Sequence, residues 1–144
     1  MRLPYRYGGE QPGEGGMDCS GTVQWVFHKL GYGSIPRTAD HQYRWLKEQR
    51  MVHKGRASDP KIWQRLKPGH LLFWKRNSWF SRRITHVMIY AGYDPKSRRH
   101  LAFGARGRSK TGINGAGVDF HPLDLDLGRK TKFIGYAALP GFEH

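Results

Sequence analysis

The hydrophobic pattern of this chain changes from helical to strand-like near residue 70, and this change most constrains the fold. Before it, apolar residues recur at the spacing of amphipathic helices, and after it they form short aromatic and β-branched runs bounded by turns. A short helix is predicted near Ile62, followed by a turn at Lys67-Pro68-Gly69. Strands are predicted at residues 70–74, 84–91, 100–105 and 133–139, with a short further strand at 118–120. Helices followed by neighbouring strands indicate a segregated α+β domain with an antiparallel sheet.

The first helix is predicted to begin at Cys19 and to end before Gly31, with Asp18 placed to cap its start. Its apolar stripe follows the i, i+3, i+4, i+7 spacing and consists of Val23, Val26, Phe27 and Leu30. A second helix is predicted to begin after Thr38, as its cap, and to run toward Gln49.

The length of 144 residues suits one domain, which we expect to span residues 1–144 as a monomer. Aromatic residues make up 13% of the chain, so large rings can compensate for a modest aliphatic content. The single cysteine excludes an intramolecular disulfide and a cysteine-based zinc site. We therefore expect neither a metal nor a cofactor, and no stretch approaches the ~20 apolar residues of a membrane span.

The formal charge of +14 comes from 25 Lys and Arg residues against 11 Asp and Glu residues. Such a charge attracts polyanions, including nucleic acid, acidic lipid and the anionic bacterial wall. The basic residues are dispersed along the chain, which favours a solvated surface over a dedicated patch. Because no zinc, helix-turn-helix or nucleotide-binding motif is present, we expect no specific nucleic-acid partner.

The only thiol, Cys19, lies in the first turn of the first predicted helix rather than in its apolar stripe. Unpaired N–H groups and the positive end of the helix dipole favour the thiolate, which is the nucleophilic form of cysteine. A cysteine used only for packing would be expected at a stripe position such as Val23, so a reactive role is favoured. Such a thiolate needs a base or an imidazolium partner.

His86 is the histidine best placed to be that partner, because it lies inside the predicted apolar strand 84–91. A histidine there is either a satisfied core residue or a functional group held rigidly, and the residues alone favour neither. The other histidines considered lie on polar helix surfaces, in loops or at the terminus, and they are His28, His41, His53, His121 and His144.

Five motifs occur in a fixed order along the chain: Pro4-Tyr5-Arg6-Tyr7-Gly8-Gly9, Asp18-Cys19-Ser20-Gly21, Pro36-Arg37-Thr38 with Gln42, Leu66-Lys67-Pro68-Gly69, and His86-Val87-Met88-Ile89-Tyr90-Ala91-Gly92. This series resembles the NlpC/P60 family of cysteine peptidases. The resemblance covers residues 4–92 strongly and extends loosely to Gly135-Tyr136-Ala137.

The resemblance implies a papain-like fold in which N-terminal helices pack on an antiparallel sheet of about five strands. It implies that Cys19 attacks the scissile carbonyl and that His86 protonates the leaving amine. The substrate would be the peptidoglycan stem peptide, often cut between D-γ-glutamyl and the diamino acid. Tyr5, Asp18 and Ser20 would line the substrate cleft, although a packing ring for Tyr5 and a helix cap for Asp18 are equally good interpretations.

Two positions depart from the family pattern. The residue that usually orients the catalytic histidine falls on Gly104, which has no side chain, and His100 is the nearest substitute in the predicted strand. At ~3.3 Å per residue His100 lies about 13 Å from position 104, so a backbone carbonyl, a water or a residue of loop 106–114 is an alternative. His70 stands where the family commonly has Asp, a change expected to alter local hydrogen bonding more than chemistry.

Alternative functions remain open on the residues alone. The same Cys–His pair would serve an amidase or acyltransferase, and the charge would suit a basic, non-catalytic wall- or nucleic-acid-binding module. If the chain is a peptidase, we expect it to act in the bacterial periplasm or cell wall, with an export route that the sequence does not reveal. A remodelling enzyme cut from a longer precursor, a phage component and a delivered toxin all fit, so an immunity, phage or secretion-machine partner is conceivable.

Overall fold

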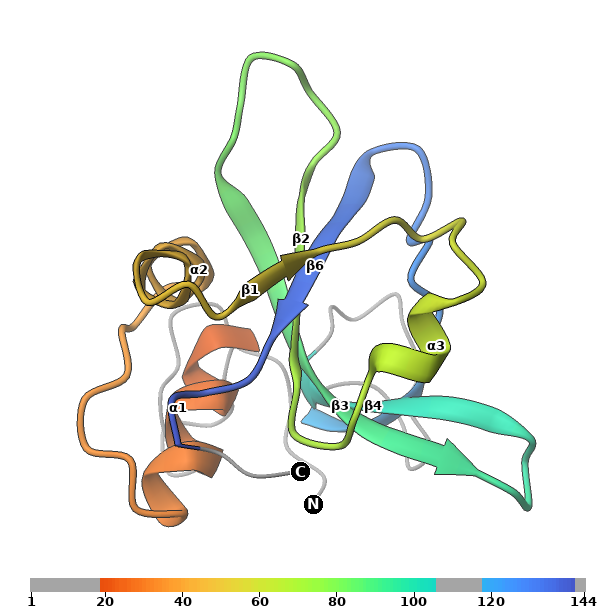
Figure 1. The fold of residues 1–144 in the computed structure, drawn as a ribbon, viewed down its shortest axis with the longest axis horizontal. Helices are drawn as coiled ribbons and strands as arrows, with labels where there is room; N and C mark the ends of the chain where they lie inside the picture. The colour runs from red at the N-terminus through yellow and green to blue at the C-terminus, as the bar shows by residue number, and fades with distance from the viewer. Residues whose placement is uncertain (1–18, 106–117, 142–144) are drawn as a thin grey trace.

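The computed structural model describes residues 19–105 and 118–141, which form two longer helices, one short helix and a six-stranded antiparallel sheet (Figure 1). This arrangement confirms the predicted α+β class. The predictions for Tyr5, Asp18, loop 106–114 and His144 lie outside the described residues.

The helices begin close to where the sequence places them: α1 at Cys19–Lys29, α2 at Ala39–Glu48 and α3 at Ile62–Arg65. Thr38 caps α2 as predicted, with its hydroxyl accepting a hydrogen bond from the backbone N–H of His41 at 3.2 Å. The prediction for Leu30 is wrong, because this side chain is 60% exposed. The helix ends at Lys29 and Gly31 adopts a φ of 100°, so Leu30 no longer follows the buried face.

The sheet has the order β1-β6-β2-β3-β4-β5, and all neighbouring strands are antiparallel. The strands are β1 Val52–Lys54, β2 Leu71–Arg76, β3 Ile84–Asp94, β4 Arg99–Ala105, β5 Val118–Pro122 and β6 Thr131–Ala137. Five of them correspond to the predicted strands. The additional strand β1 has only three residues and pairs with the end of β6, so its position depends on a partner far along the chain.

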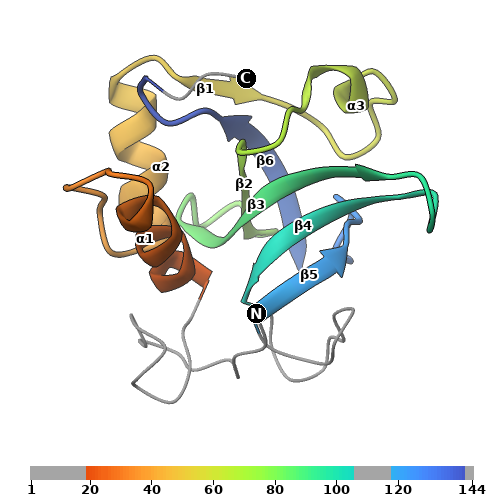
Figure 2. The same cartoon turned by 90° about the horizontal axis from the view of Figure 1, so that it is seen from below.

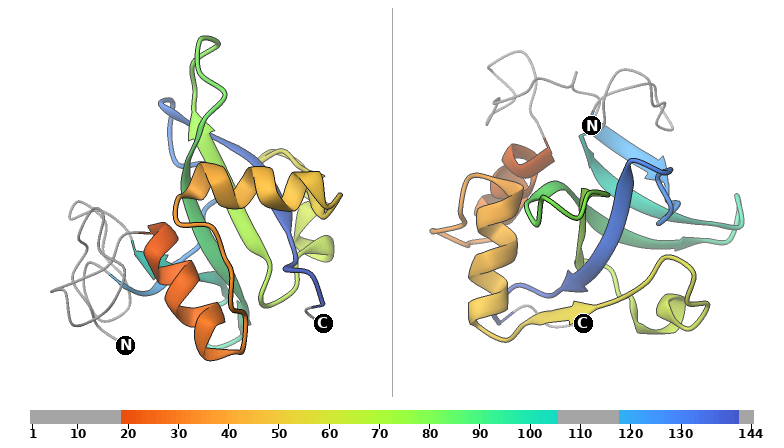
Figure 3. Two further views of the ribbon diagram at one scale, coloured as in Figure 1. Left: turned by 90° about the vertical axis from the view of Figure 1, so that its left-hand side faces the viewer. Right: turned by 90° about the horizontal axis from the view of Figure 1, so that it is seen from above.

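Alternation along the central strands builds one core on each face of the sheet. On one face Phe73, Val87 and Ile89 pack with Val23 and Phe27 of α1 and with residues of α2. On the other face Trp74 and other residues of alternate register pack with α3 and the segment after β5. Figures 2 and 3 show α1 and α2 on the same side of β3, with α3 apart from them.

None of the helices within residues 19–105 and 118–141 has the length and apolar character needed to cross a lipid bilayer.

Candidate active site

Cys19 is the first residue of α1, in the helix turn where the sequence predicts it. It is only 8% exposed, and it belongs to the same buried cluster as Val23 and Val87. The expectation that it stands apart from the apolar stripe is therefore wrong. Cys19 precedes Val23 by four residues, and residues four apart share one face of a helix. The thiol lies at a helix N-terminus and at the rim of the core at the same time.

The turn after Cys19 is held by two side chains from outside α1. Nε2 of Gln42, a fully buried residue of α2, donates to the carbonyl oxygen of Ser20 at 3.1 Å and to that of Pro36 at 2.9 Å. The guanidinium of Arg37 donates to the Ser20 hydroxyl at 2.9 Å. The motif Pro36-Arg37-Thr38 with Gln42 thus acts through the residue that follows the thiol.

His86 lies near the start of β3, where it pairs with Trp74 of β2. Its partly buried ring packs on the Trp74 ring, with centroids 5.2 Å apart and an angle of 43° between the planes. Trp74 is itself fully buried, and its indole N–H donates to the carbonyl oxygen of Leu125 at 2.8 Å. A fixed aromatic surface therefore supports the imidazole from one side.

The first residue of β3 is tied to α2. The backbone N–H of Ile84 donates to Oδ1 of Asp40 at 2.9 Å, and the other carboxylate oxygen lies 3.0 Å from Nε of Arg44. Asp40 is 7% exposed, so the bond is shielded from water. This anchor fixes the strand two residues before His86.

α1 packs against β3, so Cys19 and His86 belong to neighbouring elements (Figures 2 and 3). Val87, the next residue after His86, belongs to the same buried cluster as Cys19. The imidazole of His86 itself packs against the ring of Trp74. The register between β2 and β3 shifts between Trp74 and Lys75. Irregularities of this kind re-aim side chains and are common beside active sites.

His100 is not brought to His86. It pairs with Tyr93 at the other end of the β3–β4 hairpin, seven positions along β3 from His86. Its Nδ1 lies 2.6 Å from the hydroxyl oxygen of Tyr90, and its ring stacks on Trp63 with centroids 4.0 Å apart. Burial lowers the pKa of His100, which favours the neutral ring. These contacts give His100 a packing role in the hairpin.

Gly104, the position at which the family pattern expects an orienting residue, lies beside Met88 and pairs with Asp119 of β5. The described part of β4 ends at Ala105, so the loop 106–114 named as an alternative lies outside the described residues. Within the parts of the chain that the structure describes, no group of three or more His, Cys, Asp or Glu side chains is arranged to hold a metal ion.

His70 replaces the family's usual Asp in the turn before β2 without loss of a hydrogen-bond acceptor. The ring nitrogen Nδ1 of His70 accepts from the backbone N–H of Lys67 at 2.9 Å, and the backbone N–H of His70 donates to the Lys67 carbonyl oxygen at 3.0 Å. The accepting nitrogen requires a tautomer with the proton on Nε2. The His70 ring therefore supplies a hydrogen-bond acceptor within this turn.

Sequence reasoning missed the support that surrounds these residues. No role was assigned to Trp74 or Asp40, because their contacts depend on strand register and on the packing of α2. His121 was placed in a loop, yet it lies on β5 opposite Ala102 and is fully buried. Its run Val118–Pro122 was too short for periodicity to indicate which side chains face inward.

Comparison with known proteins gives relatives that are longer than this chain. The Bacillus subtilis protein named bifunctional muramidase/DL-endopeptidase CwlT is 38% identical over 89 residues, covering 62% of this chain and 22% of that protein. Murein DD-endopeptidase MepH of Escherichia coli is 33% identical over 89 residues, covering 62% of this chain and 28% of that protein. The chain thus spans about a quarter of the length of these curated relatives.

The fold also resembles a solved structure. The crystal structure of a Staphylococcus aureus protein of the NLP/P60 family, described as similar to lipoprotein, has a TM-score of 0.59 at 24% identity. The structural match covers 94% of this chain and 36% of the Staphylococcus aureus chain. The model of the NlpC/P60 family matches residues 2–104, which is more than half of this chain. With the order of its motifs, its helices and its antiparallel sheet in agreement, the chain belongs to the NlpC/P60 family.

Proposed function

We propose that this chain is a cysteine peptidase that hydrolyses an amide bond in the stem peptide of peptidoglycan. The observation that carries the proposal is the placement of the only thiol, Cys19, at the start of a helix packed on the strand that contains His86. Membership of the NlpC/P60 family and the endopeptidase names of its relatives support the same conclusion. Its place of action would be the bacterial periplasm or cell wall, where this substrate lies.

In the acylation step, the thiolate of Cys19 attacks the scissile carbonyl carbon and forms a new C–S bond. The first-turn N–H groups of α1 favour the thiolate electrostatically. The tetrahedral intermediate then collapses, the C–N bond breaks, and the imidazolium of His86 gives its proton to the departing amine. A thioester and a neutral imidazole remain.

In the deacylation step, neutral His86 removes a proton from water as the water oxygen attacks the thioester carbon. The C–S bond breaks, the new carboxylic acid leaves, and the thiolate–imidazolium pair returns. The Trp74 ring beneath His86 limits the movement of the imidazole between these two steps. No cofactor is required for either step.

We propose the bond between D-γ-glutamyl and the diamino acid as the one cleaved. The name of the Bacillus subtilis relative, a DL-endopeptidase, supports this bond, whereas the Escherichia coli relative is named a DD-endopeptidase. On the basis of the family resemblance, we also propose that Tyr5 and Asp18 contact the substrate. Ser20 is 5% exposed and its hydroxyl accepts from Arg37, which supports a role in holding the turn rather than in direct contact.

Digestion of purified peptidoglycan, followed by mass spectrometry of the released fragments, tests the proposal. Wild-type protein should release fragments whose new termini identify the bond, and Cys19→Ala and His86→Ala should release none. His41→Ala is the matched control, because His41 lies exposed on α2 and its side chain makes no hydrogen bond in the described structure. Intact peptidoglycan after incubation with wild-type protein would refute the proposal.

Alkylation of the single thiol provides a test of the mechanism that requires no substrate. At neutral pH iodoacetamide should modify Cys19 faster than it modifies free cysteine, because thiolate is the reacting form. His86→Ala should slow this modification, whereas His41→Ala should leave it unchanged. An unchanged rate in His86→Ala would exclude the imidazole as the partner of the thiol.

A further inference from the structure

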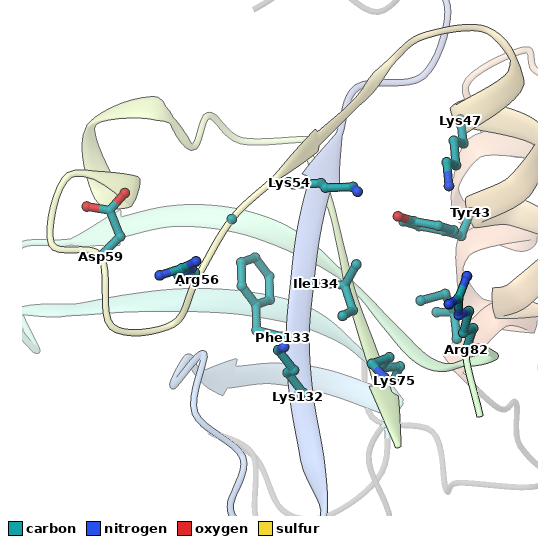
Figure 4. Close-up of a pocket in the computed structure, with 12 residues that line it drawn as sticks. Tyr43, Lys47, Lys54, Arg56, Asp59, Lys75, Arg82, Lys132, Phe133 and Ile134 are labelled. Carbon is teal, nitrogen blue, oxygen red and sulfur yellow. The ribbon is translucent and has the colours of Figure 1, made fainter. Parts of the chain in front are cut away.

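A groove of about 690 Å³ lies between α2, β1 and β6 and is bordered by basic side chains (Figure 4). Six cations from five segments of the described chain line it: Lys47, Lys54 with Arg56, Lys75, Arg82 and Lys132. Among the described residues that line the groove, Asp59 has the only carboxylate. The fold therefore brings together, around one groove, six of the 25 Lys and Arg residues that are dispersed along the sequence.

These cations are not neutralised by the part of the chain that the structure describes. None of the six forms an ion pair with a described carboxylate, although Arg44, nearby on α2, pairs with Asp40. Asp59 accepts from the backbone N–H of Lys61 at 3.0 Å and lies 3.9 Å from Arg65, outside the groove lining. Cations gathered around a concave surface repel one another, and a multiply charged anion relieves that repulsion.

The walls and floor of the groove restrict the chemistry of such an anion. Tyr43 and Phe133 are the aromatic lining residues, and they are only 9% and 3% exposed. They offer no open ring face on which a nucleobase could stack. In Figure 4 the cationic side chains come from both sides of the groove, which suits a chain of repeated anionic groups more than one compact ligand.

We propose that this groove binds a phosphodiester polymer that lacks bases, such as poly(glycerol phosphate). The choice of a cell-envelope polymer rests on the proposed function, whereas the anionic character of the ligand rests on the groove itself. Lys and Arg bind phosphate oxygens through charge-assisted hydrogen bonds. Ile84 lines the groove and begins the strand that contains His86, so the bound polymer would hold the protein on the wall close to its proposed active site.

Binding of fluorescently labelled poly(glycerol phosphate), measured by anisotropy over a range of salt concentrations, tests the proposal. The double variant Lys54→Gln/Lys132→Gln removes two exposed groove cations, and we expect about tenfold weaker binding and a salt dependence shallower by about 2 in its log–log slope. The control Lys96→Gln/Arg99→Gln removes two exposed cations from the β3–β4 hairpin, with the same loss of net charge. This control should retain wild-type affinity within about twofold.

Equal weakening in both double variants would overturn the proposal, because net charge alone would then explain binding. Tighter, groove-dependent binding of a single-stranded DNA oligomer with the same number of phosphates would also overturn it and would indicate a nucleic-acid site. Circular dichroism and urea unfolding check that the variants fold. Hydrolysis of a soluble stem peptide should be unchanged in Lys54→Gln/Lys132→Gln, so loss of polymer binding and failure of the proposed peptidase activity are distinguishable.

Discussion

Gln42→Met should loosen the turn that contains the proposed nucleophile. The side chain of Gln42 is fully buried, and its Nε2 bridges the carbonyl oxygens of Ser20 and Pro36 at 3.1 and 2.9 Å. Methionine has a similar volume and no donor, so the substitution removes both hydrogen bonds without opening a large cavity. The free energy of unfolding should therefore fall through the loss of these bonds.

The size of the effect follows from the two acceptors. The Ser20 carbonyl lies in the first turn of α1, where it also accepts a helical bond, so its share is about 1 kcal/mol. The Pro36 carbonyl loses a donor in a partly buried position and contributes about 2 kcal/mol. Oε1 of Gln42 is buried without a hydrogen-bond partner in the described structure, and removing it recovers about 1 kcal/mol. The net loss is about 2 kcal/mol, or roughly 6 °C in Tm for a domain of this size.

Urea unfolding monitored by tryptophan fluorescence gives this value, and hydrolysis under conditions where the variant is folded gives the functional effect. We expect kcat to fall about tenfold or more, because small displacements of a reacting group are costly. Gln49→Met is the control, since Gln49 is exposed and its Nε2 donates only a long hydrogen bond, 3.4 Å, to the carbonyl oxygen of Trp45. It should lose less than about 0.5 kcal/mol. A Gln42→Met variant as stable and as active as this control would refute the reasoning.

Substitutions at three further positions test the support around His86 and the hairpin. Trp74→Phe removes the indole donor to the Leu125 carbonyl oxygen and should lower the free energy of unfolding, measured in urea, by about 2–4 kcal/mol. A variant as stable as the wild-type protein would contradict the expected packing. Asp40→Ala should lower the free energy of unfolding by about 2 kcal/mol in the same assay, because the Ile84 N–H loses its acceptor. Asp40→Asn keeps an acceptor oxygen and should lower it less. Equal losses in the two variants would contradict this role of Asp40. Burial lowers the pKa of His100 below 6.5, so the unfolded chain binds a proton more readily as pH falls below 6.5 and stability declines there. His100→Phe should flatten this decline between about pH 7 and 5, and parallel stability curves would refute it.

Local signals predicted most elements of this fold. Thr38 lies two residues after Pro36 and precedes an apolar pattern, and the structure places it at the start of α2 with its hydroxyl accepting from the backbone N–H of His41. β3 is a long apolar and β-branched run, and its start at Ile84 agrees with the sequence. Such signals involve residues close in sequence, so they need no knowledge of the tertiary structure.

The features that were missed depend on residues far apart in the sequence. β1 pairs with β6 although more than 70 residues separate them, and its three residues lack a periodic pattern. Trp74 reaches His86 only through the register of β2 and β3. Cys19 shares the helix face of Val23, but its burial depends on the sheet that covers that face. Periodicity indicates an element and its apolar side, whereas register and packing determine which side chains meet.

The candidate site depends on α2, although neither proposed catalytic residue belongs to this helix. Through Gln42 it bonds the residue that follows Cys19, and through Asp40 it bonds the first residue of the strand that contains His86. Both anchors lie within one turn of the helix, so a movement of α2 displaces the thiol and the imidazole together. The same helix contributes Lys47 to the basic groove. One helix, with its start capped by the hydroxyl of Thr38, therefore links the geometry of the proposed Cys–His pair to the surface that we propose holds the polymer.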